Sequence, residues 1–517
     1  MNNNLVDAVG LVLSVCALVL AYARWLRVAQ REHYLAGSGS RFARRWWGSG
    51  PLNMVLGAVG AAGALASAWY SPAGFVAAGA AAVGPVGLTL RGRTSKLVWT
   101  GRLRRLAGAG AVLAAIPIAG FAALGWHPAF TAAALCAMGA PLLVDLALVV
   151  MKGPEARLLR PYVQQATQRL ASVKPRIVAI TGSYGKTTTK GYVAHLAAGS
   201  TSVVASPASF NNTAGLARAI NDHLATGTKV FVAEMGTYGP GEIAAMCAWA
   251  TPEIGVITAV GPVHLERMGS LERIARAKAE ILERAQVAIL NIDFPLLADL
   301  AQKAQDSGRI VWRCSSKSAE ADVSVLPEHG KLHVRTSHLR GEMDLLVAAG
   351  PEVEPGNVAC AVAAALSLGI PGEIVAARLA DLPGPAHRRN ASQSSSGVDV
   401  IDDTYNSNPA GAGAAVALLG VLASPDGQKV VVTPGMVELG HIQAAENASF
   451  AAGAAEVATQ LVVVGRTNAR SLLMGASSAG LPTRRARNLA QAVSWVSTHL
   501  GPGDAVLYEN DLPDHYP

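Results

Sequence analysis

The stretch IVAITGSYGKTTTKGY, residues 177–192, has the form of a phosphate-binding loop with an unusual spacing. In the common loop, G-x-x-x-x-G-K-[ST], one glycine precedes the glycine-lysine pair by five positions, and that position is Ile180 here. The loop instead begins at Gly182. We expect a buried strand over 176–180 and a helix from about Lys186, whose N-terminal N–H groups and dipole bind phosphate oxygens.

Two side chains of the loop suit a magnesium nucleotide. Lys186 adds a positive charge, and the hydroxyl of Thr187 can bind magnesium. A glycine-lysine pair in an irregular loop would have no such meaning. The combination of strand, loop and helix therefore predicts phosphate binding.

The composition indicates a membrane protein. The chain has 517 residues, of which 51% are apolar and 15% charged, which is too apolar for a wholly soluble protein. The basic excess, 43 − 35 = 8, is concentrated near the N-terminus, so we expect no nucleic-acid partner. The five cysteines form no zinc or disulfide pattern, which fits a reducing compartment.

Residues 1–152 predict a transmembrane region of five helices. No charged residue occurs over 46–90, and over 106–144 there is none except the usually neutral His127. A span needs about 20 apolar residues, so each stretch holds two, with hairpins at 70–74 and 125–129. A further span, the first along the chain, lies near residues 5–26 and brings the number to five.

The connections predict the orientation. Twelve basic residues lie between spans one and two or between spans three and four, and the hairpins have none. The N-terminus is then outside and the catalytic domains are cytoplasmic, in a multi-pass protein of the cell inner membrane. Asp145, inside the fifth span, either contacts a polar helix neighbour or takes part in function. The twelve are Arg24, Arg27, Arg31, Arg41, Arg44, Arg45, Arg91, Arg93, Lys96, Arg102, Arg104 and Arg105.

The rest of the chain predicts two α/β domains, over 153–385 and 386–517. Short β-rich runs alternate with helical stretches, which is typical of parallel sheets covered by helices. Shorter alternating strands near 320–350 indicate a small antiparallel piece. Proline and glycine over 382–389 mark a linker between the domains.

At this point the sequence resembles a known family. T-G-S-x-G-K-T-T-T is similar to the ATP loop of the Mur ligases, which join amino acids or peptides to a carboxylate during peptidoglycan assembly. SFNNTAG, AEMGTYGPGEI, GVITAVGPVHLERMGS, ARAKAEI, DDTYNSNP and MVELG match further family segments in order, over about 175–503. The resemblance implies an ATP-binding central domain of P-loop type and a Rossmann-like C-terminal domain, and it is strongest to the branch that adds D-alanyl-D-alanine.

The resemblance also assigns a metal and catalytic site. The magnesium ligands would be Thr187, Glu234, His264 and Lys278, the lysine being carbamylated in the family. Lys186, His264 and Lys278 would be the catalytic residues. Without the resemblance, Glu234 could equally be a surface acid at a strand end, and Lys278 an ordinary solvated lysine.

The expected nucleotide contacts extend over both domains. In the second domain, Arg388 and Asp403 resemble residues that contact the nucleotide when that domain closes. Asn357 aligns with an adenine-contacting asparagine, although Glu354 and Val353 replace its usual partners, which alters adenine recognition. In the central domain we expect contacts from Gly182, Ser183, Gly185, Lys186, Thr187, Thr188 and Asn211, with Asn212 beside it.

The implied reaction uses ATP and Mg²⁺ to form an acyl phosphate that an amine attacks, with release of ADP. Two departures concern the substrate. Membrane spans replace the family's UDP-sugar-binding domain, and GDAVLYENDLPDHYP replaces the expected GD-x-VL-x-KGS ending. We expect an amino acid or a D-Ala-D-Ala-like dipeptide to be joined to a cell-wall precursor carboxylate, with membrane lipid as a partner. Two alternatives are a poly-γ-glutamate synthase-like ligase and a non-catalytic, nucleotide-regulated membrane scaffold; the sequence leaves the oligomeric state open.

Overall fold

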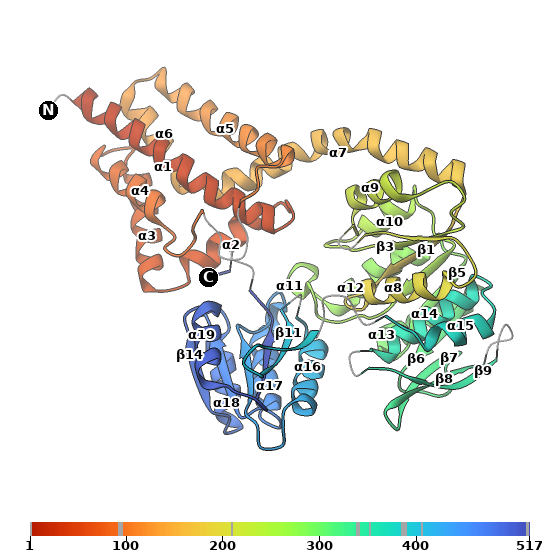
Figure 1. Cartoon of the computed structure of the whole chain (residues 1–517). Coiled ribbons are helices and arrows are strands. Elements are labelled where there is room, and N and C mark those ends of the chain that lie inside the picture. Colours follow the sequence, from red (N-terminus) through yellow and green to blue (C-terminus); the bar gives the residue numbers. More distant parts are fainter. Residues whose placement is uncertain are drawn as a thin grey trace. The chain divides into compact units, whose positions relative to one another are not determined.

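The computed structural model describes residues 3–90, 97–207, 210–337, 342–350, 353–383, 390–404, 407–512 and 516–517. The chain forms two compact units, which we describe separately (Figure 1). The helical unit contains residues 1–158 and 512–517, and the α/β unit contains residues 159–511. Arg91, Arg93, Lys96 and Arg388 of the sequence analysis lie outside the described residues.

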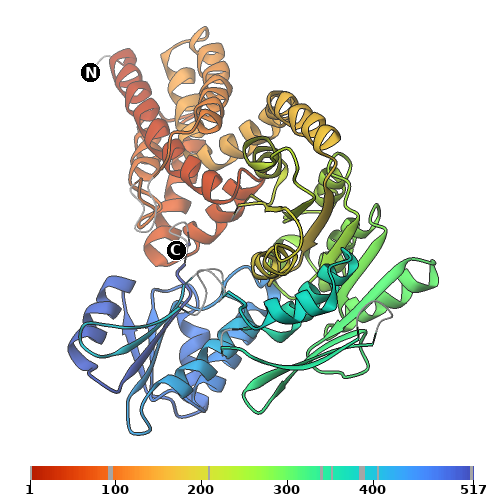
Figure 2. The same cartoon turned by 45° about the vertical axis from the view of Figure 1, so that its right-hand side comes forward.

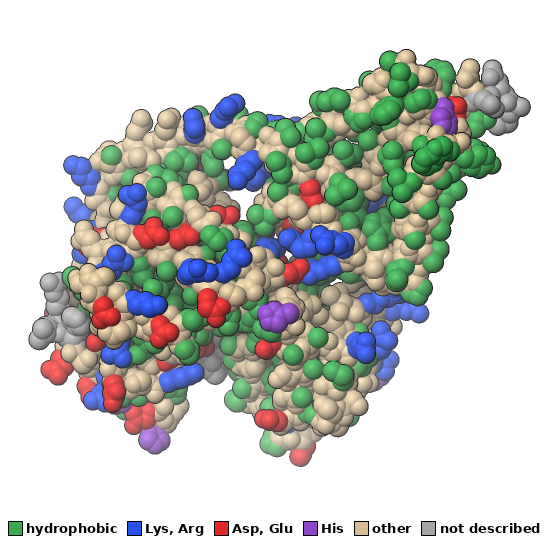
Figure 3. Space-filling model, turned by 180° about the vertical axis from the view of Figure 1, so that it is seen from behind, with side chains coloured by type: hydrophobic (Ala, Val, Ile, Leu, Met, Phe, Trp, Pro, Cys, Tyr) green, Lys and Arg blue, Asp and Glu red, His purple; other side chains and the backbone are tan. Residues whose placement is uncertain are grey.

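The helical unit consists of apolar helices with many exposed hydrophobic side chains, which are visible in Figure 3. Val12, Val19, Leu52, Leu65 and Trp69 are among them. The helices are α1 (Asn3–Arg31), α2 (Ser38–Trp47), α3 (Pro51–Ala66), α4 (Pro72–Val83), α5 (Gly101–Ala122), α6 (Trp126–Met138) and α7 (Ala140–Val173), the last of which continues into the α/β unit.

Among the described residues, two to four segments could cross a membrane. Helices α1 and α5 are each long and apolar enough. The pairs α2–α3 and α6–α7 qualify only as broken spans, bent by 119° and 80°. Helix α4 has 12 residues and is about 18 Å long, short of a hydrocarbon core of about 30 Å. The expectation of five spans is therefore not confirmed.

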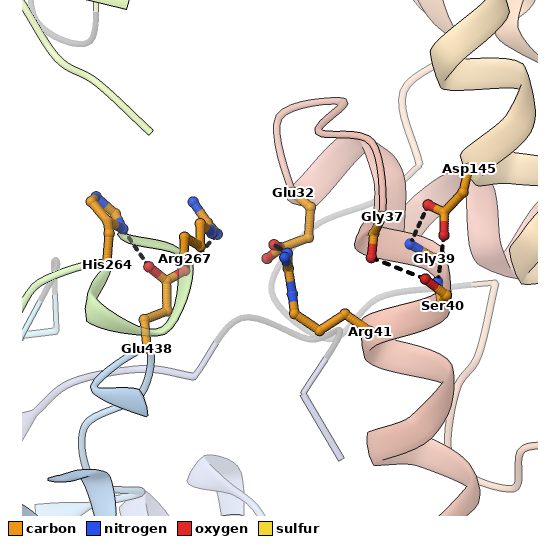
Figure 4. Close-up of polar contacts among 9 residues, drawn as sticks. All are labelled: Glu32, Gly37, Gly39, Ser40, Arg41, Asp145, His264, Arg267 and Glu438. Carbon is orange, nitrogen blue, oxygen red and sulfur yellow. Dashed lines mark hydrogen bonds and ion pairs between the residues drawn. The ribbon is translucent and has the colours of Figure 1, made fainter. Parts of the chain in front are cut away.

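Asp145 has a structural partner in the helical unit. Its carboxylate accepts the backbone N–H groups of Gly39 and Ser40, each at 2.8 Å, and so caps the N-terminus of α2 (Figure 4). The two helices lie very close here, because a Cβ on Gly39 would be 2.3 Å from the carbonyl oxygen of Pro141. Of the two readings of Asp145, the structure supports the contact with a helix neighbour.

Several basic residues of the first connection are used inside the helical unit. Arg24 is buried and donates to the carbonyl groups of Ala81 and Gly84 near the end of α4. Arg27 donates to the carbonyl oxygen of Thr89 at 2.8 Å, and Arg41 pairs with the buried Glu32 at 2.5 Å (Figure 4). These basic side chains therefore bind helices to one another, in addition to being among the basic residues that predict the orientation in the membrane.

The first sheet of the α/β unit is mostly parallel, as expected. Its order is β2-β3-β1-β4-β5-β6-β7-β8-β9, and only the pairs β7–β8 and β8–β9 are antiparallel. The strands are β1 (Arg176–Thr181), β2 (Val203–Ala205), β3 (Val230–Glu234), β4 (Ile254–Ile257), β5 (Val287–Asn291), β6 (Ile310–Ser315), β7 (Val323–Glu328), β8 (Lys331–Thr336) and β9 (Met343–Ala348).

Helices cover both faces of this sheet (Figures 1 and 2). One core contains residues of α8 (Lys186–Ala197), α14 (Pro355–Ser367) and α15 (Gly372–Leu379). The other contains the end of α7, α9 (Thr213–His223), α10 (Glu242–Cys247), α12 (Leu271–Ala279) and α13 (Pro295–Asp306). The carboxyl ends of β1, β3 and β4 therefore meet at one edge, where open α/β sheets bind ligands.

A second sheet follows the expected linker. Its order is β10-β11-β15-β12-β13-β14, and all pairs are parallel except β10–β11. Helices α16 (Pro409–Leu422), α17 (Gln443–Ala454) and α18 (Ala469–Ser478) pack on one face and α19 (Leu489–His499) on the other. The strands are β10 (Asn390–Gln393), β11 (Asp399–Asp403), β12 (Lys429–Thr433), β13 (Gln460–Val464), β14 (Thr483–Ala486) and β15 (Ala505–Glu509).

Candidate active site

The loop between β1 and α8 needs both of its glycines. A Cβ on Gly182 would lie 2.0 Å from the hydroxyl oxygen of Thr258. Gly185 has a φ of 82°, and a Cβ there would lie 2.2 Å from Oδ1 of Asn357. The backbone therefore lies directly against two polar side chains, which only glycine allows.

The loop is held by β4 and the residues after it. Ser183 donates its N–H to the carbonyl oxygen of Ala259 at 2.8 Å, and its hydroxyl both donates to and accepts from the backbone of Gly261. The hydroxyl of Thr258 donates to the carbonyl oxygen of Tyr184 at 2.5 Å. The N–H and the hydroxyl of Ser183, which we expected to contact phosphate, therefore bond to the segment after β4 and hold the loop in shape.

Lys186 and Thr187 begin α8 beside the end of β3. The ammonium group of Lys186 donates to the carbonyl oxygen of Gly182 at 2.8 Å, so the side chain folds back over the loop. The hydroxyl of Thr187 donates to the Glu234 carboxylate at 2.9 Å. Thr188, on the same turn, is half-buried. Thr187 and Glu234 thus lie together, as two ligands of one magnesium ion must.

Glu234 is buried in a cluster that keeps it ionised. It accepts hydrogen bonds from Lys190 at 3.0 Å and Asn211 at 3.3 Å. Burial acts to raise the pKa of the Glu234 carboxyl, but the ammonium groups of Lys190 and Lys186, with the hydrogen bonds from Lys190 and Thr187, outweigh it and lower the pKa. An ionised carboxylate is the form that binds a metal ion.

The two neighbouring asparagines differ in role. Asn211 contacts Glu234, whereas Asn212 accepts the N–H of Gly215 at 3.0 Å and caps α9. Asn212 is therefore accounted for by the helix that it begins.

His264 lies between the two sheets of the α/β unit, before the short helix α11 (Leu265–Met268). Its Nδ1–H donates to the carboxylate of Glu438, which also accepts from Arg267 at 2.8 Å (Figure 4). The ring of Tyr238 lies edge-on to the imidazole at 5.1 Å. Burial lowers the pKa of His264 despite the opposing effect of Glu438, which favours the neutral, metal-binding imidazole.

Lys278 is buried on α12, with 5% of its surface exposed. Burial, reinforced by the charge of Lys186, holds the pKa of its amine well below the ordinary value. Among the described residues its amine has no hydrogen-bond or ion-pair partner. A buried, neutral amine is the form that reacts with carbon dioxide, because the ammonium ion has no lone pair.

Lys186 is the common neighbour of the site, since its charge shifts the pKa values of Glu234, His264 and Lys278. No group of three His, Cys, Asp or Glu side chains that could hold a metal ion occurs in the described part of the chain. Thr187, Glu234 and His264 fit Mg²⁺ once phosphate oxygens or a carbamate on Lys278 supply the remaining oxygen ligands.

Of the other expected nucleotide contacts, Asn357 lies against the loop, whereas Asp403 lies in the second sheet. Asn357, in the first turn of α14, places its carboxamide against Gly185, and this group has no hydrogen bond within the described residues. Asp403 ends β11 in the second sheet and is buried.

Sequence reasoning missed Lys190 and Glu438. Lys190 lies four residues after Lys186, one turn along α8, and this spacing could have indicated that both face the same site. Glu438 lies in the MVELG segment, but its partner His264 is 174 residues earlier, so nothing local pointed to the contact.

The altered C-terminal ending places an acidic residue in the second sheet. Glu509 ends β15 beside Asp403 in the parallel register and is fully buried. Its carboxyl accepts hydrogen bonds from Ser407 and Thr433. Burial raises the pKa of Glu509 to about 7, with a smaller contribution from Asp403 in the same direction.

Comparisons with known proteins agree with this geometry. Residues 180–365 match the Mur ligase middle domain, and residues 387–508 match the Mur ligase glutamate ligase domain. The UDP-N-acetylmuramoyl-tripeptide--D-alanyl-D-alanine ligase of Mycobacterium leprae is 33% identical over 64% of this chain and 70% of its own length. The enzyme of that name from Escherichia coli is 30% identical, over 60% and 69%.

Solved structures support the fold. MurF from Acinetobacter baumannii superposes with a TM-score of 0.59 at 24% identity, covering 68% of this chain and 77% of that one. MurF ligase from Thermotoga maritima in complex with ADP gives 0.56 at 24% identity, covering 68% and 80%.

Proposed function

This chain belongs to the Mur ligase family, and we propose that it joins an amino acid or a D-Ala-D-Ala-like dipeptide to the carboxylate of a cell-wall precursor. Mur ligases are ATP-dependent, ADP-forming amide ligases that use Mg²⁺. The observation that carries the proposal is the convergence of the shortened loop, Glu234, His264 and Lys278 around Lys186. The curated relatives named as D-alanyl-D-alanine ligases support the choice of amine.

The residues of the site suit phosphoryl transfer from ATP to a carboxylate. The N-terminus of α8 and Lys186 would hold the phosphates and stabilise the charge that develops during transfer. Thr187, Glu234 and His264 would hold magnesium, which neutralises phosphate charge when bound. The amine then attacks the acyl phosphate and displaces phosphate. The second α/β domain, which carries Asp403, would close to align the amine.

Lys278 would contribute as a carbamate. The neutral amine attacks carbon dioxide, loses a proton and becomes a carbamate anion, which the positive charge of Lys186 stabilises. We predict a carbamate carbon signal from the full chain in ¹³C-labelled bicarbonate, absent in Lys278→Ala. The control is Lys303→Ala on α13, which keeps the signal because Lys303 is exposed. A signal that persists in Lys278→Ala would contradict the assignment.

We further propose that the helical unit holds the enzyme at the cell inner membrane, with the catalytic domains cytoplasmic, and that the precursor is linked to a membrane lipid. Two to four candidate spans and the basic connections support this. The helical unit also stands where the family has its UDP-sugar-binding domain, so another means of delivering the carboxylate is needed.

The test uses membranes that contain the full chain. ATP, Mg²⁺ and candidate amines, including D-Ala-D-Ala, are added, and the lipid and nucleotide fractions are analysed by mass spectrometry. In the lipid fraction we expect an amide product whose mass is the sum of the precursor and the amine less one water. We expect no such product with Lys186→Ala. A product confined to the nucleotide fraction would overturn the lipid-linked part alone, whereas ligation unaffected by Lys186→Ala would overturn the proposed catalytic site.

A further inference from the structure

We infer that Glu438 is a positioning residue for His264: in the closed enzyme its carboxylate fixes the proton on Nδ1 and leaves Nε2 to bind magnesium. The inference rests on the proposed function, because it concerns the same metal site. Through Glu438, the position of the second α/β domain would decide whether His264 is in the tautomer that binds magnesium.

The hydrogen bond defines the tautomer of the imidazole. A carboxylate only accepts, so the contact between Nδ1 of His264 and Oε2 of Glu438 places the proton on Nδ1. In the neutral ring the lone pair is then on Nε2, which lies on the side of the ring away from Glu438 (Figure 4). Metal-binding histidines commonly donate their other N–H to a carboxylate in this way.

Glu438 is itself held firmly. Its second carboxylate oxygen accepts from Arg267 at 2.8 Å, and its backbone carbonyl accepts the N–H of Glu266 at 3.0 Å. Two residues further on, a Cβ on Gly440 would lie 3.3 Å from the backbone of Glu266. The carboxylate therefore has little freedom to leave the imidazole while the two segments are in contact.

Both partners of the contact have a disfavoured backbone conformation. His264 has a φ of 63° and Glu438 a φ of 65°, although neither is glycine. Such conformations cost free energy and persist only where the surroundings hold them, which is frequent at functional sites. Here the strained residues face each other across the junction of two domains.

The contact joins the two α/β domains. His264 belongs to the first sheet's domain, and Glu438 lies between β12 and η2 (Gly440–Ile442) of the second. If the second domain opens, Nδ1 loses this acceptor and the imidazole is free to change tautomer and to rotate. Closure would therefore complete a metal ligand at the moment when the amine is aligned.

A simpler reading is that Glu438 only fastens the domains through Arg267. Calorimetric titration of Mn²⁺ into the full chain in detergent with ADP separates the two readings. Glu438→Leu removes the contacts of Glu438 with His264 and with Arg267. Glu438→Gln keeps an acceptor for the Nδ1–H of His264, and Arg267→Leu removes only the contact between Arg267 and Glu438. Thermal unfolding of each variant checks the fold.

We expect Glu438→Leu to lower the affinity for one Mn²⁺ ion by about 10- to 100-fold, which is the usual effect of removing the hydrogen-bond partner of a metal-binding histidine. Glu438→Gln should largely restore the affinity, and Arg267→Leu should lower it less than Glu438→Leu. Equal losses in Glu438→Leu and Arg267→Leu, or wild-type affinity in Glu438→Leu, would overturn the inference while leaving the proposed function intact. Failure of the wild-type chain to bind Mn²⁺ with ADP would overturn both.

Discussion

At the scale of single residues, Lys190 and Glu234 show how the site is kept ready before magnesium binds. Their side chains form a buried ion pair at 3.0 Å, and Thr187 donates to the same carboxylate oxygen. A buried carboxylate without a partner is costly, so the lysine holds the charge that a metal ion would otherwise balance. Lys190 thus balances the charge of the buried Glu234 carboxylate.

Loss of Lys190 should destabilise the protein in a magnesium-dependent way. We predict that Lys190→Met lowers the stability of the first α/β domain by about 3 kcal/mol, because the charge of Glu234 stays buried without its nearest cation. Added Mg²⁺ and ADP should recover much of the loss. Thermal unfolding with and without Mg²⁺ measures both effects, and in the double variant with Glu234→Gln the magnesium dependence should disappear.

Glu509 predicts a dependence of stability on pH. Its pKa in the folded chain is raised to about 7, so between its ordinary pKa and 7 the unfolded chain loses a proton that the folded chain keeps. The contribution of Glu509 to the free energy of unfolding is therefore greatest below the ordinary pKa and decreases as the pH rises to about 7. Glu509→Gln should abolish this fall and be more stable at pH 8 by up to about 3 kcal/mol.

Chemical denaturation between pH 4 and 8 tests this prediction. The difference between Glu509→Gln and the wild-type chain should grow over that range. A difference that does not vary with pH would show that Glu509 is not a protonated acid in the fold.

At the scale of elements, the strand, loop and helix around residues 176–197 were predictable because apolar strand residues, glycines and a helix start follow one another locally. The alternation of strands and helices also predicted mostly parallel sheets, but not the order of their strands. The breaks in the helices of the helical unit were not predictable, because a hydropathy window averages over the 119° bend between α2 and α3. The cap on α2 needed Asp145, about a hundred residues further along the chain.

That cap can be tested directly. Asp145→Ala removes the acceptor for two backbone N–H groups of α2, and we predict a loss of about 1–2 kcal/mol. Asp145→Asn keeps one oxygen and should lose less. Thermal unfolding in detergent gives the order of the three proteins, and equal stability of Asp145→Ala and the wild type would contradict the capping role.

At the scale of the whole molecule, composition and basic residues predicted a membrane part with cytoplasmic domains after it, and the motifs predicted a Mur-type ligase; the family comparisons confirm the ligase. Composition could not settle the number of crossings, because α4 is apolar but short and two other candidates are bent. Likewise, Glu438 and His264 meet only through the arrangement of two domains, which no local pattern encodes.

If the chain crosses the membrane five times, as the sequence predicts, both hairpins lie outside the cell. Cysteines introduced at Tyr70 and Trp126, which are exposed, should react with a membrane-impermeant maleimide in intact cells. A cysteine at Leu158, also exposed, should react only after permeabilisation. The wild-type chain gives the background from its own cysteines. Protection of either hairpin in intact cells would exclude five crossings.

The last residues of the chain belong to the helical unit, where the ring of Tyr516 lies edge-on to Phe42 at 5.0 Å and beneath the guanidinium group of Arg45. The ligase portion is consequently inserted between the two segments of the helical unit and attached to it by two covalent connections rather than one. A body attached at one point can swivel about any axis, whereas one attached at two points turns only about the line that joins them.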